Sequence, residues 1–226
     1  MLHSIIQSLK GGLIVSCQAL EGEPFYGSDY MARFAIAAEM GKAVGIRANT
    51  PQDIRAIKQV SHLPLIGLWK QDYSGSDVYI TPTLQEIEGV IAAGADIVAM
   101  DATLRPRPGG MNLAEIVEKI REKHQVLLMA DVSTVAEGEE AEKLGFDLIS
   151  TTLSGYTDYS PQGEEPDIQL VADLSRKVGI PVLAEGKIYT PGQASQCIQA
   201  GAYAVVIGGA ITRPQLITKK FTDAIR

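Results

Sequence analysis

The sequence predicts a single α/β domain folded as a (β/α)8 barrel, the TIM-barrel architecture, and three observations support this prediction. Short apolar segments rich in β-branched residues alternate with polar amphipathic segments along the whole chain, as in repeated strand–helix units around a parallel sheet. There are eight segments of each kind. The 226 residues leave about 28 residues for each unit, which is within the range of a compact barrel.

The eight expected strands are short and largely apolar. In chain order they cover residues 13–19, 43–48, 65–70, 96–101, 125–131, 147–152, 180–185 and 202–208. The competing architecture is a doubly wound open sheet, which normally carries a glycine-rich nucleotide fingerprint after an early strand. No such fingerprint follows residues 13–19. We therefore expect the strands to close into a barrel.

The expected helices separate the strands. They cover residues 30–41, 51–60, 83–94, 113–124, 134–144, 167–178, 190–200 and 214–225. Gly94, Gly145 and Gly201 stand just before three of the strands, where the left-handed C-cap of a helix requires glycine. Pro51 and Pro191 stand at helix starts, where a missing N–H has no consequence.

Composition and charge exclude several classes of protein. With 46% hydrophobic and 21% charged residues, the chain can bury a core and is not intrinsically disordered. The 20 basic and 27 acidic residues give a net charge of −7, which argues against attraction to a polyanion. We therefore expect neither a nucleic-acid partner nor a membrane partner.

Cysteine and histidine are too sparse for a disulfide framework or a zinc site. The cysteines are Cys17 and Cys197, and the histidines are scattered at His3, His62 and His124 without ligand spacing. The first residues lack the features of a secretory signal, and no apolar stretch approaches the length of a membrane span. We expect a cytoplasmic protein without a metal ion.

Polar residues that close apolar strands are informative, because chemistry in a barrel gathers at the carboxyl ends of the strands. They are Gln18, Arg47, Lys70, Asp101, Asp131, Thr152 and Glu185. Strand alternation places Lys70, Asp131 and Glu185 on the face that is expected to point into the barrel. A cation and two carboxylates therefore converge on one cavity. A structural role is favoured for Asp101 and Thr152, and a functional role for Lys70 and Glu185.

The loops after the seventh and eighth strands predict a phosphate site. Gly186 follows the seventh strand, and Gly208 and Gly209 follow the eighth, with a helix start just beyond each. In barrels, backbone N–H groups and a helix dipole at this place bind phosphate, and Arg213 would add a guanidinium fork. The alternative is that these glycines are ordinary turns and that Arg213 lies on the surface.

Two further stretches carry polar residues with more than one interpretation. ATLRPRPGG, residues 102–110, holds two arginines that would suit phosphate or substrate, but its prolines suggest a stiff loop with a structural or subunit-contact role. TLSGYTDYS, residues 152–160, is either a lid or a flexible solvated loop. Cys17 is one step off the face of Gln18, and no histidine ends a strand, so a nucleophile–histidine pair finds no support.

Nine segments, in order along the chain, resemble the N-acetylmannosamine-6-phosphate 2-epimerase family. They are GLIVSCQALEGEP (12–24), AVGIRAN (43–49), LPLIGLWKQDY (63–73), YITPTL (79–84), DATLRPRP (101–108), LLMADVST (127–134), TTLSGYT (151–157), LAEGKI (183–188) and GGAITRPQ (208–215). The resemblance implies a barrel enzyme of sialic-acid and amino-sugar catabolism that interconverts N-acetylmannosamine 6-phosphate and N-acetylglucosamine 6-phosphate.

The resemblance also implies roles for individual residues. Lys70 and Glu185 would be the catalytic pair. Gln18, Arg47 and Asp131 would hold the sugar, and Arg213 with the adjacent glycine turns would hold the phosphate. The chain departs from the family at Gln71, where a basic residue is common, and at Lys187, where arginine is common.

Inversion at carbon 2 requires a base and a group that stabilises charge, and it requires no cofactor. A lysine can be this base if a desolvated site lowers its pKa from ~10.4 toward neutrality. Glu185 would relay a proton or assist ring opening, and Arg47 would stabilise an oxyanion.

Two rival functions remain open from the sequence. One is a Schiff-base aldolase built on Lys70, and the other is a non-catalytic barrel that senses a sugar phosphate. The expected partner in each case is a small sugar phosphate. We also expect a homo-oligomer, with a dimer favoured.

Overall fold

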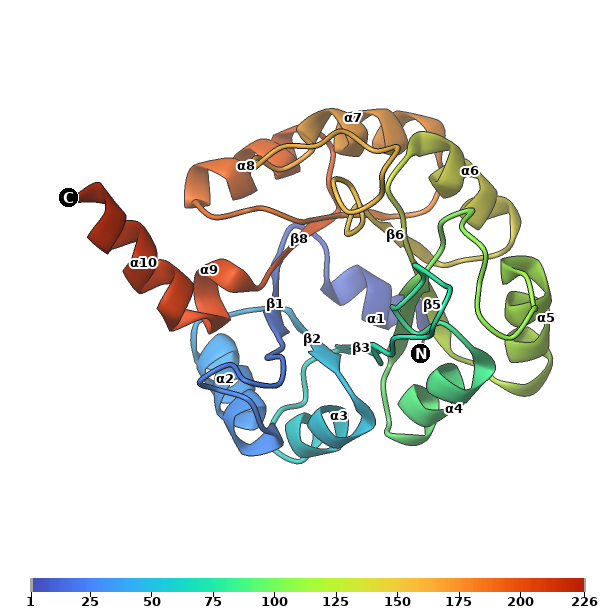
Figure 1. The fold of residues 1–226 in the computed structure, drawn as a ribbon, viewed down its shortest axis with the longest axis horizontal. Coiled ribbons are helices and arrows are strands. Elements are labelled where there is room, and N and C mark those ends of the chain that lie inside the picture. The colour runs from blue at the N-terminus through green and yellow to red at the C-terminus, as the bar shows by residue number, and fades with distance from the viewer. Residues whose placement is uncertain (1, 226) are drawn as a thin grey trace.

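The computed structural model describes residues 2–225 and confirms the predicted barrel (Figure 1). Eight parallel strands close in sequence order, with β8 pairing β1. They are β1 (Leu13–Cys17), β2 (Gly45–Asn49), β3 (Leu65–Leu68), β4 (Ile97–Asp101), β5 (Leu127–Asp131), β6 (Leu148–Ser150), β7 (Val182–Glu185) and β8 (Ala204–Ile207). Several predicted strands extend one or two residues beyond the observed ladder, because the chain leaves the sheet before its inward-facing polar residue.

Eight helices lie where the sequence predicts them; seven cover the outside of the barrel, and the last projects from it (Figure 1). They are α2 (Ser28–Met40), α3 (Pro51–Lys58), α4 (Leu84–Ala92), α5 (Leu113–Lys123), α6 (Val135–Lys143), α7 (Ile168–Lys177), α8 (Pro191–Gln199) and α10 (Pro214–Ala224). Two short helices are not predicted, α1 (Leu2–Ser8) and α9 (Gly209–Thr212). Within residues 2–225, no helix has the length and apolar character needed to cross a bilayer.

The helix boundaries follow local chemistry. Thr83, Thr134 and Thr190 accept hydrogen bonds at helix N-termini, each within a reciprocal capping box. The predicted left-handed glycines are observed, with φ of +94° at Gly94 and +87° at Gly145. These caps fix where each helix begins after its strand, and so they fix the paths of the loops at the carboxyl end.

Strand alternation separates two apolar cores. Leu68, Met129 and Leu183 belong to the inner core that fills the barrel, as the sequence predicts. The residues between them on the strands, such as Leu128 and Val182, pack outward against the helices. Side chains two positions beyond the inner core, at the carboxyl ends, therefore point into the mouth of the barrel.

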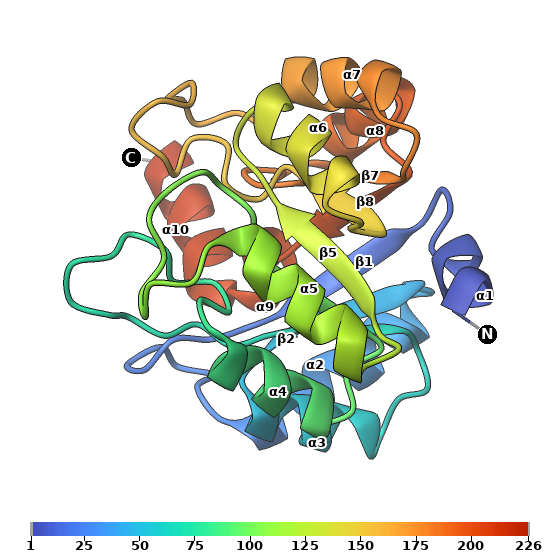
Figure 2. The same cartoon turned by 90° about the vertical axis from the view of Figure 1, so that its right-hand side faces the viewer.

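Helix α1 lies across one end of the barrel, and the long loops extend from the other (Figure 2). Ile5 and Ile6 of α1 pack against the inner core, and Leu9, just after the helix, is fully buried in it. The Gly11 N–H donates to the Tyr203 carbonyl at 2.7 Å and ties this segment to the chain before β8. The amino end of the barrel is thus covered, whereas the carboxyl end carries a cavity.

The arginine-rich stretch after β4 is structural. Arg105 forms an ion pair with the fully buried Asp101 at 2.6 Å. Arg107 donates to the backbone carbonyls of Asp101 and Pro82 at 2.5 and 3.2 Å. Both arginines therefore hold the loop in place, and the contacts of Asp101 agree with the structural role that the sequence favours for it.

Candidate active site

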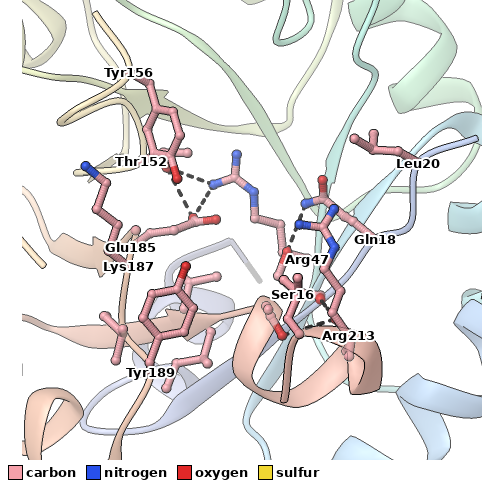
Figure 3. Close-up of a pocket in the computed structure, with 18 of the residues that line it drawn as sticks. Ser16, Gln18, Leu20, Arg47, Thr152, Tyr156, Glu185, Lys187, Tyr189 and Arg213 are labelled. Carbon is pink, nitrogen blue, oxygen red and sulfur yellow. Dashed lines mark hydrogen bonds and ion pairs between the residues drawn. The ribbon is translucent and has the colours of Figure 1, made fainter. Parts of the chain in front are cut away.

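A cavity of about 280 Å³ opens at the carboxyl end of the strands (Figure 3). Eight of the nine expected site residues line it, namely Gln18, Arg47, Lys70, Glu185, Gly186, Gly208, Gly209 and Arg213. The ninth, Asp131, does not line the cavity. Its carboxylate is fully buried behind Arg47. The strand-end pattern therefore brings these residues together at one place, and Asp131 supports the cavity from behind.

Arg47 is the centre of the polar network at the cavity floor. Its guanidinium is almost completely buried and forms a two-bond contact with Asp131, with Nη2 to Oδ2 at 2.6 Å and Nη1 to Oδ1 at 3.0 Å. Nη1 also lies 2.5 Å from Oε2 of Glu185. The two carboxylates raise the pKa of Arg47 against the effect of burial, so the guanidinium remains charged.

Thr152 connects the two carboxylates beside Arg47, as the dashed lines in Figure 3 show in part. Its hydroxyl donates to Asp131 Oδ1 at 2.6 Å and accepts from Arg47 Nη1 at 3.1 Å. It also lies 3.2 Å from Glu185 Oε2. Thr152 is therefore part of the cavity network, and the purely structural role favoured for it needs correction.

Glu185 ends β7 with its carboxylate in the cavity and its backbone fixed on both sides. Thr151 accepts from the Glu185 N–H at 3.0 Å and donates to the Glu185 carbonyl at 2.9 Å. Burial raises the pKa of the Glu185 carboxyl above its usual value, and the Asp131 carboxylate adds to this effect while Arg47 opposes it. A carboxyl held in this way is suited to carrying a proton.

Lys70 follows β3 and is held through its backbone. Its N–H donates to the Asn49 side chain at 2.8 Å, and Lys70 forms an antiparallel bridge with Ile80 in the returning loop. Burial and the positive charge of Arg47 lower the pKa of the Lys70 amine to about 8, although Glu185 opposes this. Across residues 2–225, no carboxylate forms an ion pair with its Nζ. A fraction of the amine is therefore neutral near pH 7.

The glycine turns after β7 and β8 lie along one wall of the cavity. Gly186 has φ of +105°, which an L side chain adopts only with strain. Gly208 precedes α9, whose first N–H groups have no acceptor within the helix. Arg213 stands between α9 and α10 and lines the same cavity. The predicted phosphate residues are therefore brought together.

Several lining residues were not assigned to the site from the sequence, and five of them carry polar groups and come mostly from loops. They are Ser16, Tyr79, Tyr156, Lys187 and Tyr189. Ser16 shares the inward face of β1 with Gln18 and accepts a hydrogen bond from its amide at 2.9 Å, so strand alternation was a usable signal. Lys187 has φ of +58° and its Nζ lies 5.2 Å from the centre of the Tyr156 ring.

Nucleophilic cysteine chemistry has little support at this site. Cys17 points away from the cavity into the outer core, and burial raises the pKa of its thiol to about 12. Within the described residues, no group of three or more His, Cys, Asp or Glu side chains has the arrangement of a metal site. The chemistry of the cavity is that of an amine, a carboxyl and a buried guanidinium.

Comparison with known proteins connects this site to one family. A family model described as "Putative N-acetylmannosamine-6-phosphate epimerase" matches residues 31–226. The chain belongs to this family. Among its relatives is a "Putative N-acetylmannosamine-6-phosphate 2-epimerase" of Caldanaerobacter subterraneus, 57% identical over 100% of this chain and 96% of that protein. A second, from Clostridium perfringens, is 50% identical over 98% of this chain and all of the relative.

The architecture of this epimerase-family chain also matches solved structures. The N-acetylmannosamine-6-phosphate 2-epimerase of Clostridium perfringens has a TM-score of 0.95 and 50% identity, with 97% of this chain and 96% of that one covered. A thiamine phosphate pyrophosphorylase of Pyrococcus furiosus has a TM-score of 0.63 but only 17% identity, with 93% of each chain covered. The second likeness shows the barrel fold alone.

Proposed function

We propose that this protein interconverts N-acetylmannosamine 6-phosphate and N-acetylglucosamine 6-phosphate by proton transfer at carbon 2. Membership of the epimerase family supports the reaction and its substrate. The observation that carries the mechanism is Lys70, a buried cavity lysine whose pKa is lowered to about 8 beside Glu185. A lysine with these properties is an effective base near neutral pH.

Lys70 acts on the open-chain aldehyde form of the sugar. The hydrogen on carbon 2 is acidic because it lies beside the aldehyde carbonyl, and the neutral Lys70 amine removes it. The electron pair moves onto the carbonyl oxygen as an enolate. A proton from Glu185 or from solvent then adds to the opposite face of carbon 2, which inverts that centre, and Lys70 releases to solvent the proton that it took. The reaction is balanced in atoms and electrons without an oxidant, a metal or an organic cofactor.

Glu185 is the proton carrier of the pair. Burial raises its pKa above the usual value for a glutamate, which makes this carboxyl a better proton carrier than an exposed one. We assign to it the delivery of a proton, either through a sugar hydroxyl or during ring opening. Ser150 and Thr152 hydroxyls lie 3.3 and 3.2 Å from its Oε2 and keep the carboxyl aimed into the cavity.

Arg47 and Asp131 act as a unit. The Arg47 charge stabilises the enolate oxygen, and Asp131 fixes the guanidinium through both of its oxygens. Because Asp131 is fully buried, we assign it the positioning of Arg47 in place of direct contact with the sugar. Gln18 reaches the cavity from the end of β1 and is suited to binding the N-acetyl group.

The sugar phosphate binds at the wall that the loops after β7 and β8 form. The N–H groups of Gly186, Gly208 and Gly209 and the guanidinium of Arg213 form the anion site that we propose. We assign carbon 2 to a position beside Lys70 in the same cavity. Sialic-acid and amino-sugar catabolism in the cytoplasm is the metabolic setting that such a substrate implies, and neither a nucleic acid nor a membrane takes part.

A homodimer is the assembly that we propose. Helix α10 projects from the barrel, and within the described residues it contributes no buried side chain (Figure 1). Its Phe221 is 72% exposed, and Leu216 and Ile225 at or near the same helix are also exposed. Exposed apolar side chains gathered on one helix often mark a contact with a partner. Light scattering coupled to size exclusion would give the mass that decides this.

The direct test is turnover of N-acetylmannosamine 6-phosphate followed by NMR. We expect N-acetylglucosamine 6-phosphate to accumulate with the wild type and turnover to fall at least about 100-fold in Lys70→Ala. An aldolase would release a smaller carbonyl product and would be trapped on Lys70 by borohydride with substrate. A sensing barrel would bind the sugar phosphate without turnover. Either result would contradict the proposal.

A further inference from the structure

Glu23 lies outside the residues assigned to the reaction, in the LEGEP segment that helps to carry the family resemblance. It belongs to the loop between β1 and α2 and is partly buried. Its Oε2 accepts from the Leu20 N–H at 2.6 Å, and its own N–H donates to the Leu20 carbonyl at 3.0 Å. Leu20 lines the cavity. Glu23 therefore closes a tight turn at the cavity edge.

The same carboxylate binds the segment that carries the proposed phosphate arginine. Arg213 Nε lies 2.9 Å from Oε1 of Glu23, and Arg213 Nη2 donates to Oε2 at 3.1 Å. Gln215 Nε2 also donates to Oε1 at 3.2 Å. Two segments about 190 residues apart in sequence are thus fastened by one carboxylate.

Glu23 contacts only one edge of the Arg213 guanidinium. A guanidinium offers two edges with paired donors, and Glu23 lies along the edge formed by Nε and Nη2. Nη2 donates a hydrogen bond to Oε2, whereas Nε lies in ion-pair contact with Oε1 without the geometry of a hydrogen bond. This leaves Nη1 of Arg213 without a hydrogen-bond acceptor among residues 2–225. In Figure 3, Arg213 lies on the cavity wall with Gln18 and Leu20. The free edge is the one available to an anion in the cavity.

We propose that Glu23 is the positioning residue of the phosphate site, because it holds one edge of Arg213 and thereby presents the other to the phosphate. The inference rests on the proposed function for the identity of the ligand. Arg213 needs such a holder, since it immediately precedes α10, a helix without buried side chains among its described residues. Glu23 also sets the β1–α2 loop, through Leu20, against the same wall.

A glutamine cannot replace this carboxylate. Three donor groups converge on Glu23, from Leu20, Arg213 and Gln215. A carboxylate only accepts, whereas the amide of glutamine would turn N–H donors toward one of these groups. The guanidinium would lose its charge-assisted pairing and its fixed orientation.

The test compares Glu23→Gln with Glu21→Gln, which removes the same charge from an exposed position of the same loop. Calorimetry measures binding of inorganic phosphate, and kinetics measure KM and kcat for N-acetylmannosamine 6-phosphate. We expect Glu23→Gln to weaken phosphate binding and raise KM by about tenfold, with kcat changed by less than about twofold. Glu21→Gln should leave both near wild type.

Arg213→Ala and the double variant Glu23→Gln/Arg213→Ala complete the design. If Glu23 acts through Arg213, its substitution changes phosphate binding by less than about twofold once Arg213 is absent. A full tenfold effect in that background would overturn the proposal, as would tighter binding in Glu23→Gln, which would mean that the carboxylate competes with phosphate.

The phosphate measurement separates this inference from the proposed function. It reports on the anion site even in a protein that shows no turnover. If Arg213→Ala weakens phosphate binding and Glu23→Gln does not, the role of Glu23 is wrong while the phosphate site stands. If Arg213→Ala has no effect, the proposed phosphate site fails together with the role of Glu23.

Discussion

Replacement of Lys70 by methionine should stabilise the protein at neutral pH while it abolishes turnover. Methionine keeps the length and apolar stem of the side chain but removes the amine. The pKa of Lys70 is lowered from 10.5 to about 8 because the folded cavity disfavours its charged form. A lowered lysine pKa means that protonation opposes folding, so the amine reduces stability wherever it is charged in the folded state.

The size of the effect follows from the pKa values. With about 1.4 kcal/mol for each pKa unit, the charged amine destabilises the fold by about 3 kcal/mol below pH 8. Above pH 8 the folded protein loses the proton while the unfolded chain keeps it to about pH 10.5. The stability gained in Lys70→Met should therefore be largest at pH 7, where we expect about 1–3 kcal/mol, and below about 1 kcal/mol at pH 10.

Urea unfolding at pH 7 and pH 10 measures this difference. The control is Lys10→Met, an exposed lysine whose replacement should leave stability within about 0.5 kcal/mol at both values. A Lys70→Met protein that is no more stable than wild type at pH 7, or whose gain does not shrink at pH 10, would refute the reasoning. Lys70 would then be an ordinary charged lysine and a poor base.

Three further results are expected. The value of kcat/KM should rise about tenfold per pH unit and level off near pH 8, because the pKa of Lys70 is about 8. A profile that is flat from pH 6 to 8 would exclude Lys70 as the base. Arg213→Ala should raise KM by an amount equivalent to ~1.5–3 kcal/mol, with Arg33→Ala as an exposed control. An unchanged KM would place the phosphate elsewhere. Asp131→Asn should lower the free energy of unfolding in denaturant by ~3–5 kcal/mol, because it leaves the buried Arg47 without this charged partner. A loss under about 1 kcal/mol would contradict the importance of this pair.

The barrel itself was predictable because its signal is repeated. Every strand is a short apolar segment, and glycine or proline marks many of the junctions between strand and helix. An error at one junction therefore does not change the number of strand–helix units that is predicted. The helices α1 and α9 were missed for the opposite reason. With seven and four residues, they are too short to show periodicity, and their positions depend on the barrel end that each one contacts.

The candidate site was predictable where strands carry it. Alternation alone aims Lys70 and Glu185 into one cavity, and the structure brings them together there with Arg47. Alternation predicts which face of a strand a side chain lies on, but it does not predict how deeply the side chain is buried. The sequence therefore could not show that Asp131 lies behind Arg47 and not on the cavity surface. Asp131 is buried because it pairs with Arg47 through both oxygens, a contact between strands β2 and β5 that the barrel creates.

Loop residues carry weaker signals. Tyr79 reaches the cavity because the segment after Lys70 returns antiparallel to it, with the Gln71 N–H bonded to the Tyr79 carbonyl at 2.9 Å. Lys187 reaches the cavity because its backbone has a positive φ, which cannot be predicted from a lysine in the sequence. Glu23, the partner of Arg213, lies about 190 residues away in the sequence. No pattern in the sequence predicts that these two residues are in contact.

The central claim is that Lys70 and Glu185 invert carbon 2 by proton transfer, and one NMR time course tests it directly. N-acetylmannosamine 6-phosphate is followed in deuterium oxide with the wild type and with Lys70→Ala, after dialysis of both proteins against a strong chelator. We expect the wild type to form N-acetylglucosamine 6-phosphate that carries deuterium at carbon 2, and Lys70→Ala to form almost none. Inversion with full retention of the original hydrogen would contradict the claim, as would loss of activity on chelation.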